Sequence, residues 1–286
     1  MPRIDTATKL CAVIGAPVGH SLSPAMHNAA FEAAGLNYVY VAFHVDDVGA
    51  CLTGMRALRS FRGMSVTIPH KVAVMPFLDE IDPMAVKVGC VNTIVNHDGR
   101  LAGSTTDGLG TLKAFADAGV DLRGKRVLFL GAGGAVRSVA FAFADMAEAA
   151  HITILGRDAG KVAALVRDLP AKTRVSVAGG DLAGDLAQAM AAHDVVAQGT
   201  PVGMYPHPDA TCVPKELLRP DHVVFDMVYR PLKTRFVKDA EESGCKTILG
   251  VEMLVNQAAL QFETWTGETA PYAVMREALL AELNTD

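Results

Sequence analysis

The chain has 286 residues, of which 50% are hydrophobic and 20% charged, so it can build about two globular domains and is not a disordered protein. Its net charge of -5 excludes a generally basic surface for nucleic acid, and no apolar stretch approaches the roughly 18 residues of a membrane span. The N-terminus lacks the cationic flank and apolar run of a secretory signal. The cysteines form no CxxC pair, which indicates reduced thiols in a cytoplasmic protein: Cys11, Cys51, Cys90, Cys212 and Cys245.

Short apolar runs alternate with longer helical patterns in the first part of the chain. We expect strands over Leu10–Ile14, Tyr38–Phe43 and Met64–Ile68. Between them, helical patterns cover Pro24–Ala34 and Val48–Leu58. This alternation predicts a parallel sheet that is covered by helices.

The same alternation restarts near Asp121 and continues to the end of the chain. Further strands are expected over Arg126–Leu130, Ile152–Leu155, Arg174–Val177, Val195–Ala197, Val223–Asp226 and Thr247–Leu249. Further helices are expected over Gly108–Ala118, Ala135–Ala147, Ala159–Asp168, Leu182–Met190, Gly250–Trp265 and Ala273–Leu283. The fold class is therefore α/β, with two α/β domains.

A glycine-rich turn, Gly131-Ala-Gly-Gly-Ala, lies between one of these strands and the helix after it. Gly131 permits a tight turn, Gly133 lets the backbone approach a pyrophosphate, and the helix N-terminus offers unpaired N–H groups. Val136 stands where the dinucleotide-binding pattern G-x-G-x-x-G has its third glycine. The strand–turn–helix context favours a dinucleotide site over a plain structural turn.

The end of the next strand, at Gly156-Arg157-Asp158, reports on the choice of cofactor. Arg157 and Lys161 could hold the 2′-phosphate of NADP, whereas a carboxylate there could accept from the ribose of NAD. Asp158 fits either a ribose ligand or a helix N-cap. The residues favour NADP and leave NAD open.

Three polar segments interrupt the apolar pattern of the first half of the chain, at residues 15–28, 63–71 and 91–108. Together they supply hydroxyls, an amide, an ammonium and a carboxylate, which suits a small polyhydroxylated carboxylic acid. His20 and His27 have no neighbouring carboxylate cluster, so capping and packing are expected for them rather than metal binding.

These segments resemble the shikimate dehydrogenase family, which includes the quinate/shikimate dehydrogenases. The matching motifs follow in the family's order from residue 15 to about 267: HSLSPAMHN, SVTIPHK, VNTI, TTDG, GAGGAVR, GTPVGM, DMVYRPLKT and GVEMLVNQ. The resemblance implies reversible NADP-dependent reduction of 3-dehydroshikimate to shikimate, in the chorismate pathway that supplies aromatic amino acids.

In this resemblance Lys71 stands at the family's catalytic lysine and Asp107 at its partner carboxylate. A lysine that is withdrawn from water can exchange the proton of the substrate oxygen, and a carboxylate can orient it and bind the hydroxyl. The matching substrate contacts are Ser21, Ser23, Thr67, Asn92, Asp107, Tyr229 and Gln257. The matching cofactor contacts are Gly131, Ala132, Gly133, Gly134, Ala135, Arg157, Asp158, Lys161, Thr200, Met227 and Gly250.

The chain departs from the family at a few positions. Ser65 and Thr105 replace frequent asparagines, which leaves open whether shikimate or quinate is preferred. Gly156 replaces another asparagine and Asp158 a threonine, which weakens the NADP assignment. The alternatives are an NAD-preferring quinate/shikimate dehydrogenase and, from another class, a non-catalytic sensor that binds a dinucleotide or a cyclic acid.

The resemblance also implies the layout of the domains. Residues 1–106 with 250–286 would form a discontinuous substrate-binding domain, and residues 107–249 a Rossmann-type domain for NAD(P), with the active site in the cleft between them. The expected partners are small molecules, without nucleic acid, membrane or metal. No exposed apolar stripe decides between a monomer and a homodimer.

Overall fold

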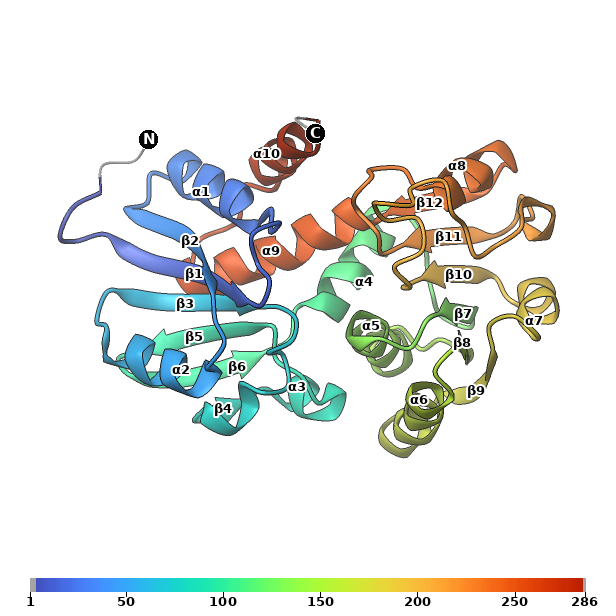
Figure 1. Ribbon diagram of the computed structural model, residues 1–286, viewed down its shortest axis with the longest axis horizontal. Helices are drawn as coiled ribbons and strands as arrows, with labels where there is room; N and C mark the ends of the chain where they lie inside the picture. Colours follow the sequence, from blue (N-terminus) through green and yellow to red (C-terminus); the bar gives the residue numbers. More distant parts are fainter. Residues whose placement is uncertain (1–3, 285–286) are drawn as a thin grey trace. The chain divides into compact units, whose positions relative to one another are not determined.

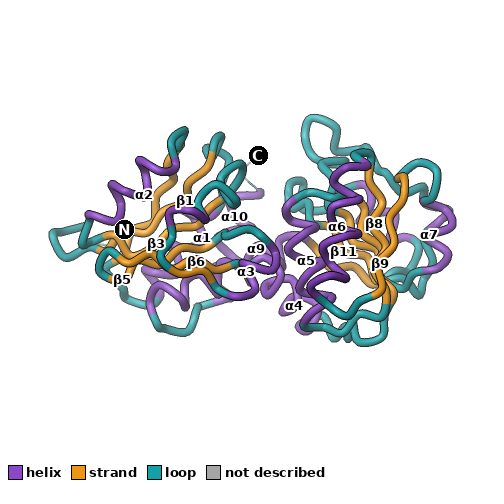
Figure 2. Tube along the Cα trace, turned by 90° about the horizontal axis from the view of Figure 1, so that it is seen from below, coloured by secondary structure: helices purple, strands orange, loops and turns teal. Residues whose placement is uncertain are grey.

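The computed structural model describes residues 4–284. The chain divides into two compact units: unit 1 contains the residues up to Thr106 and those from Val255 on, and unit 2 contains Asp107–Leu254. In each unit helices flank a central sheet (Figures 1 and 2). Within the described residues, no helix combines the length and the apolar character needed to cross a membrane.

Unit 1 holds a mixed sheet. Its strands, in the spatial order β2-β1-β3-β5-β6-β4, are β1 (Lys9–Gly15), β2 (Tyr38–His44), β3 (Phe61–Val66), β4 (Glu80–Ile81), β5 (Thr93–His97) and β6 (Arg100–Ser104). Its helices are α1 (Ser23–Ala33), α2 (Val48–Ala57), α3 (Pro83–Val88), α10 (Tyr272–Leu283) and the short 3-10 helix η1 (Met75–Phe77). Helix α9 (Gly250–Thr266) begins in unit 2 and continues into unit 1.

The expected parallel pairing is confirmed for the three strands that the sequence predicted in unit 1, but the whole sheet is mixed. Strands β1, β2 and β3 are parallel, but β5 runs antiparallel to both β3 and β6. The reversal between β5 and β6 comes from a two-residue turn at Asp98-Gly99, whose φ angles of 52° and 94° suit a hairpin that reverses the chain at once. A parallel pairing needs a longer crossover, and this turn leaves no room for one.

Two apolar layers cover the sheet of unit 1. On one face, Ala12, Ile14 and Met64 pack with the buried side chains of α2 and α3. On the other face α9 approaches the sheet so closely that a Cβ at Gly63 would lie 2.2 Å from Trp265 Nε1. The Trp265 indole is fully buried and donates to the Ile94 carbonyl at 3.0 Å. The lone tryptophan therefore joins α9 to β3 and β5.

Unit 2 holds a wholly parallel sheet in the order β12-β11-β10-β7-β8-β9. The strands are β7 (Arg126–Leu130), β8 (His151–Gly156), β9 (Ser176–Asp181), β10 (Val195–Gln198), β11 (Val223–Asp226) and β12 (Lys246–Leu249). The helices are α4 (Asp107–Asp117), α5 (Gly134–Asp145), α6 (Ala159–Lys172), α7 (Leu186–Ala192), α8 (Arg235–Glu242) and the 3-10 helix η2 (Lys215–Leu217). Read outward from β7, this is the doubly wound Rossmann order, which reverses between β7 and β10.

The helices of unit 2 lie on opposite faces of its sheet, with α5 and α6 on one side and α7 on the other (Figure 2). Helices α7 and α8 pack on the face that carries Leu128 and Val196. On the other face, Phe143 of α5 contacts Phe129 of β7 and Phe115 of α4 at ring distances of 5.7 and 5.0 Å. Both faces are therefore buried, as the near-continuous apolar runs of the strands require.

Most expected elements form within a few residues of their expected bounds, with β7 and β11 as expected. Helix α7 begins at Leu186 instead of Leu182, because the Asp181 carboxylate accepts the N–H groups of Ala183 and Gly184 and holds a turn there. Strand β3 lies over Phe61–Val66 and ends before Pro69, which has no N–H for a ladder. The hairpin β5–β6 and helices α3 and α8 were not expected.

Candidate active site

The polar segments of unit 1 meet at the C-terminal ends of β1 and β3. Gly15 lies so close to Thr67 that a Cβ on Gly15 would be 2.5 Å from Thr67 Cγ2. The Ala16 N–H donates to the Ile68 carbonyl at 3.1 Å, and the Val66 N–H donates to the Asn92 carbonyl at 2.8 Å. These contacts bring the three segments that the sequence singled out into one place, where the C-terminal ends of parallel strands commonly bind ligands.

Lys71 lies in the turn after β3 and is half-buried. Its carbonyl accepts the Val91 N–H at 2.8 Å, so its backbone is held beside the neighbouring residue Asn92. Thr67, in the same turn, donates its N–H to Ile14 at 2.9 Å and accepts from the His70 N–H. The backbone of the turn that carries Lys71 is thus held by β1 and by the segment just before β5.

Asn92 is at the centre of a buried hydrogen-bond network. Its side-chain oxygen accepts from the Thr93 hydroxyl at 2.7 Å and the Thr106 N–H at 2.9 Å, and its amide donates to the Thr106 hydroxyl at 3.1 Å. That hydroxyl lies 3.4 Å from the Gln257 side-chain oxygen. Asn92 and Gln257, 165 positions apart in the sequence, are therefore brought together through Thr106.

The network continues behind these residues into the core of unit 1. Gln261 donates to the Thr93 hydroxyl at 2.9 Å and accepts from Ser65 at 2.7 Å, and Ser65 in turn accepts from Tyr40 at 2.6 Å. The Ser65 hydroxyl, which replaces an asparagine that is frequent in the family, thus forms its hydrogen bonds within the core. Sequence reasoning missed Gln261 and Tyr40. The available signal was a second glutamine four residues after Gln257, which places both on one face of an apolar helix.

The first polar segment supplies Ser21 and Ser23, which lie at the start of α1. The Ser23 N–H lies 3.4 Å from the Ser21 hydroxyl oxygen, and Ser23 is buried. His27, one turn further, stacks on Tyr40 at 4.4 Å and packs against the Trp265 ring at 5.1 Å. Complete burial lowers the pKa of His27 to about 3, so its imidazole is a neutral packing group. In residues 4–284, no group of three or more His, Cys, Asp or Glu side chains is gathered as a metal site would need.

Unit 2 carries a candidate dinucleotide site at the reversal point of its sheet, between the ends of β7 and β10. Gly131 has a φ of +106°, and a Cβ there would lie 3.0 Å from the Gly199 carbonyl oxygen, so only glycine fits. Gly133 caps α5 without a side chain, and a Cβ on Gly133 or Gly134 would meet no atom within 4 Å. The backbone at the start of α5 therefore has open space beside it. This cradle fits the pyrophosphate of a dinucleotide.

Val136 at the third position of the glycine pattern is accommodated by Gly199. Val136 is fully buried, and a Cβ on Gly199 would lie 2.3 Å from Val136 Cγ2. The third glycine of the pattern normally allows a helix and a strand to pack closely. Here the small residue stands directly after β10 instead of on the helix, so the close packing is kept.

Arg157, Asp158 and Lys161 follow β8. The Asp158 carboxylate accepts the Lys161 N–H at 3.0 Å and caps α6, and this bond is the main cause that lowers its pKa. The Lys161 ammonium lies 3.5 Å from the same carboxylate. Arg157 is exposed and forms no ion pair with any described residue. The cap explains Asp158 structurally, and Arg157 remains available for a phosphate.

Two buried side chains fix the loops that carry Thr200, Met227 and Tyr229. Gln198 donates to the carbonyls of Thr200 and Val202 at 3.1 and 3.0 Å. Asp226 accepts from the Thr234 hydroxyl at 2.5 Å and the Val228 N–H at 3.0 Å, and its burial raises its pKa to about 6. A Cβ on Gly250 would lie 2.6–2.8 Å from three carbonyl oxygens of this loop, so α9 must begin with glycine.

Asp107 is the first residue of α4 and of unit 2, and it is 6% exposed. Thr105, two residues before it, is equally buried, and its hydroxyl has no hydrogen-bond partner among the described residues. Tyr229 is half-buried in the loop after β11. The pairing of Asp107 with Lys71 stays a prediction.

The chain is similar to known proteins along nearly its whole length. Residues 13–94 match the family model of the shikimate dehydrogenase substrate binding domain, and residues 250–280 match that of the shikimate 5'-dehydrogenase C-terminal domain. A protein of Moorella thermoacetica named shikimate dehydrogenase (NADP(+)) is 44% identical over 98% of this chain and 95% of its own length.

Two solved structures are also similar along nearly the whole chain. Shikimate 5-dehydrogenase from Listeria monocytogenes, in complex with shikimate and NAD, has a TM-score of 0.92 and 38% identity, covering 98% of this chain and 99% of its own. Quinate dehydrogenase from Corynebacterium glutamicum, in complex with NAD, has a TM-score of 0.90 and 31% identity, covering 96% and 99%.

Proposed function

The chain belongs to the shikimate dehydrogenase family, and from this membership we propose that it catalyses the reversible NADP-dependent reduction of 3-dehydroshikimate to shikimate. It is accordingly an NADP-dependent oxidoreductase that acts on a CH–OH group. The observation that carries the substrate is the polar constellation of unit 1. Asn92 and Gln257 come from distant segments and are joined by a buried network, and the backbone of Lys71 is bonded to Val91, the neighbour of Asn92.

The unit 1 residues suit a ring that carries hydroxyls and one carboxylate. The hydroxyls of Ser21 and Ser23 lie at the start of α1, where a carboxylate is stabilised by the helix dipole. Thr67, Asn92 and Gln257 offer hydroxyl and amide groups for the ring hydroxyls, with Tyr229 supplied by unit 2. We assign these residues to substrate binding because each offers a hydrogen-bonding group for the carboxylate or a hydroxyl of the substrate.

The unit 2 residues suit the dinucleotide. When bound, its nicotinamide ring gives or accepts the hydride at the carbinol carbon. The cradle at Gly131–Ala135 takes the pyrophosphate, and Arg157 with Lys161 takes the 2′-phosphate. Thr200, Met227 and Gly250 border the same end of the sheet, where Gln198 and Asp226 hold their loops rigid.

The residues Lys71 and Asp107 serve the proton transfer in this proposal. As hydride arrives at the carbonyl carbon, the oxygen gains negative charge and needs a proton, which the Lys71 ammonium supplies. In the reverse direction the Lys71 amine accepts that proton. Asp107 hydrogen-bonds the same hydroxyl and orients the ammonium.

Initial rates for shikimate and quinate, each with NADP and NAD, test the function. We expect the highest kcat/KM for shikimate with NADP. A higher value for quinate with NAD would establish the alternative that the Corynebacterium relative and the Ser65 and Thr105 departures suggest. If the protein binds the ligands but turns over none of the four combinations, the alternative of a non-catalytic sensor would be supported.

Replacement of Lys71 by alanine tests the proton-transfer role. We expect Lys71→Ala to reduce kcat by about two to four orders of magnitude, the loss expected for an acid–base group, with an unchanged melting temperature. Lys113→Ala is a matched control, because Lys113 is an exposed lysine that only pairs with Asp117 on α4. Equal turnover in the Lys71 and Lys113 variants would remove Lys71 from the mechanism.

We further propose that the protein works in the cytoplasm with reduced thiols. All five cysteines are free, and burial raises the pKa of Cys212 to about 11, which keeps that thiol protonated. Light scattering would decide between the monomer and the homodimer that the sequence left open.

A further inference from the structure

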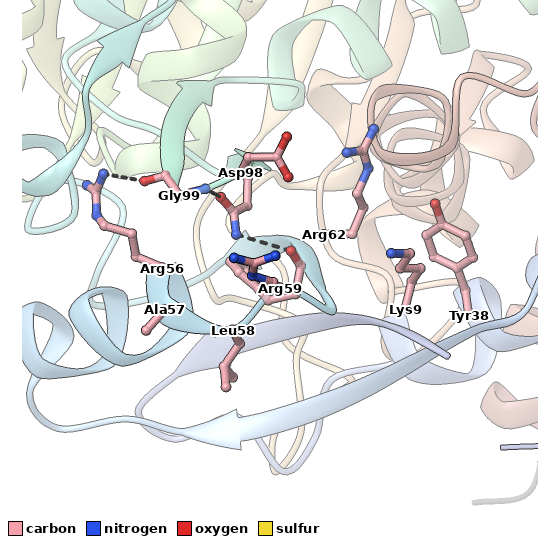
Figure 3. A pocket seen from close by; sticks show the side chains of 11 residues that line it. Lys9, Tyr38, Arg56, Ala57, Leu58, Arg59, Arg62, Asp98 and Gly99 are labelled. Atoms are coloured by element: carbon pink, nitrogen blue, oxygen red, sulfur yellow. Dashed lines mark hydrogen bonds between the residues drawn. The ribbon is translucent and has the colours of Figure 1, made fainter. Parts of the chain in front are cut away.

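A pocket lies in unit 1, at the end of the sheet opposite to the substrate residues, and Figure 3 shows the side chains that line it. It has a volume of about 560 Å³ and is built on the first residues of three parallel strands: Lys9 begins β1, Tyr38 begins β2, and Arg62 is the second residue of β3. The substrate segments leave the other ends of the same strands. At ~3.3 Å per residue, the length of β1 separates the two places by about 20 Å.

The pocket is strongly basic although the whole chain is acidic. Four cations line it, namely Lys9, Arg56, Arg59 and Arg62, against the single carboxylate of Asp98. Arg56 is occupied, because it pairs with Asp79 and donates to the carbonyls of Phe77 and Gly99. Within residues 4–284, no carboxylate forms an ion pair with the other three cations. Three positive charges therefore share one hollow with one negative charge.

One of these cations is already oriented by the fold. Arg62 donates its Nε to the Trp265 carbonyl at 2.8 Å, in the last turn of α9, where a cation is stabilised by the helix dipole. The Tyr38 hydroxyl lies beside the same guanidinium, and burial raises the pKa of Tyr38, so this hydroxyl stays a hydrogen-bond donor. Arg59 lines the same pocket, and Figure 3 shows it between Arg56 and Lys9 in this view.

The presence of an aspartate at position 98 is explained by the turn in which it lies, and not by the neighbouring cations. It occupies one of the two positive-φ positions of the β5–β6 hairpin, where aspartate and asparagine are both well tolerated. The neighbouring Gly99 N–H is held by the Asn96 side chain at 2.7 Å. Removal of the Asp98 charge should therefore leave the hairpin intact and make the pocket more positive.

We propose that this pocket binds a small phosphate monoester, with Arg59, Arg62 and Lys9 on the phosphate. A dianion balances the excess charge, and planar guanidinium groups match the oxygen pairs of a phosphate. The volume exceeds what a bare phosphate needs and falls in the range of small-molecule sites. The exposed side chain of Leu58 gives the organic part an apolar wall. The site is separate from the proposed catalytic one and does not depend on it.

Calorimetric titration with glycerol 3-phosphate and with inorganic phosphate, at low salt and without cofactor, tests this inference. We expect one site, with glycerol 3-phosphate bound at least as tightly as inorganic phosphate. The double variant Lys9→Gln, Arg59→Gln should weaken binding by at least tenfold, since two charge-assisted contacts are lost. Both side chains are exposed, and neither forms an ion pair with a described residue, so the variant should keep the wild-type melting temperature. Asp98→Asn should tighten binding severalfold.

A second anion-binding place on the chain requires a control. Arg157→Gln removes a cation from the proposed cofactor site and should leave the affinity for glycerol 3-phosphate unchanged. Loss of binding in Arg157→Gln with retention in the Lys9, Arg59 variant would overturn the proposal. So would the absence of saturable binding to the wild type, or the same affinity in all variants.

Discussion

The contact between Gly199 and Val136 leads to a sharp prediction about the cofactor domain. A Cβ on Gly199 would lie 2.3 Å from Val136 Cγ2 and 3.0 Å from Met227 Sδ. Carbon atoms in contact prefer a separation of about 3.5–4.0 Å, so Gly199→Ala creates an overlap of more than about 1 Å. Val136 is fully buried and cannot move away, and such overpacking costs about 2–3 kcal/mol of the free energy of unfolding.

Truncation of Val136 should remove most of that cost. Val136→Ala alone deletes two buried methyl groups and should destabilise by about 2 kcal/mol. In the double variant the methyl group introduced by Gly199→Ala replaces part of the lost volume, so the total cost should fall at least about 1 kcal/mol below the sum of the two. A shift of the Gly199 backbone should also distort the glycine-rich cradle, because Gly131 lies against the Gly199 carbonyl. The KM for NADP should therefore rise in Gly199→Ala and recover in part in the double variant.

Urea unfolding of the four proteins, with KM for NADP measured on each, checks this prediction. The energies must be taken from one cycle under one set of conditions. Strict additivity of the two single costs would refute the reasoning, because it would mean that the two side chains do not compete for the same space.

The remaining predictions concern the buried network, the pH dependence of stability and the cofactor. Gln261→Leu removes one hydrogen-bond partner from each of the buried Ser65 and Thr93 hydroxyls, so we expect a loss of about 2–4 kcal/mol in urea unfolding and a higher KM for shikimate. The exposed Gln188→Leu is its control, and an equal KM in both would contradict a positioning role. Asp226 has a raised pKa of about 6 in the folded state, so the folded protein binds its proton more tightly than the unfolded chain. Its contribution to the free energy of unfolding therefore falls as the pH rises from about 4 to about 6, by an amount on the order of 3 kcal/mol. The difference in unfolding free energy between wild type and Asp226→Asn should therefore decline over that window, and a flat or rising difference would argue against it. Arg157→Ala should raise the KM for NADP much more than that for NAD in steady-state assays, whereas equal effects would mean that Arg157 does not touch the 2′-phosphate.

Local signals were sufficient for most of the secondary structure. Strands such as β7 are short apolar runs because a parallel sheet is buried on both faces, and Gly131 ends β7 where only glycine can turn. The Asp98-Gly99 pair also carries a local signal typical of a hairpin turn. The predicted first residue of α7 was wrong because side chains such as Asp181 compete with the helix for backbone N–H groups, and the outcome depends on exact geometry.

The candidate site was predictable as a set of residues but not as an arrangement. The motifs named Asn92 and Gln257, yet the network that orients them includes Gln261 and Ser65, which are 196 positions apart. Nothing in the spacing of these residues indicates their contact. The same holds for Val136 and Gly199, where a missing glycine in one motif is compensated by a glycine in another.

By itself the sequence determined the α/β class, the strand–turn–helix of the dinucleotide site, and the family with its proposed catalytic pair, because these depend on short-range patterns of burial and glycine. Only the tertiary structure decided that β5 runs antiparallel to β3, that Asn92 is fixed from the core, and that Lys9, Arg59 and Arg62 share a basic pocket. The physical reason is that strand pairing and side-chain networks join residues that are far apart in the chain. Their energies depend on distance in space, which a linear pattern does not contain.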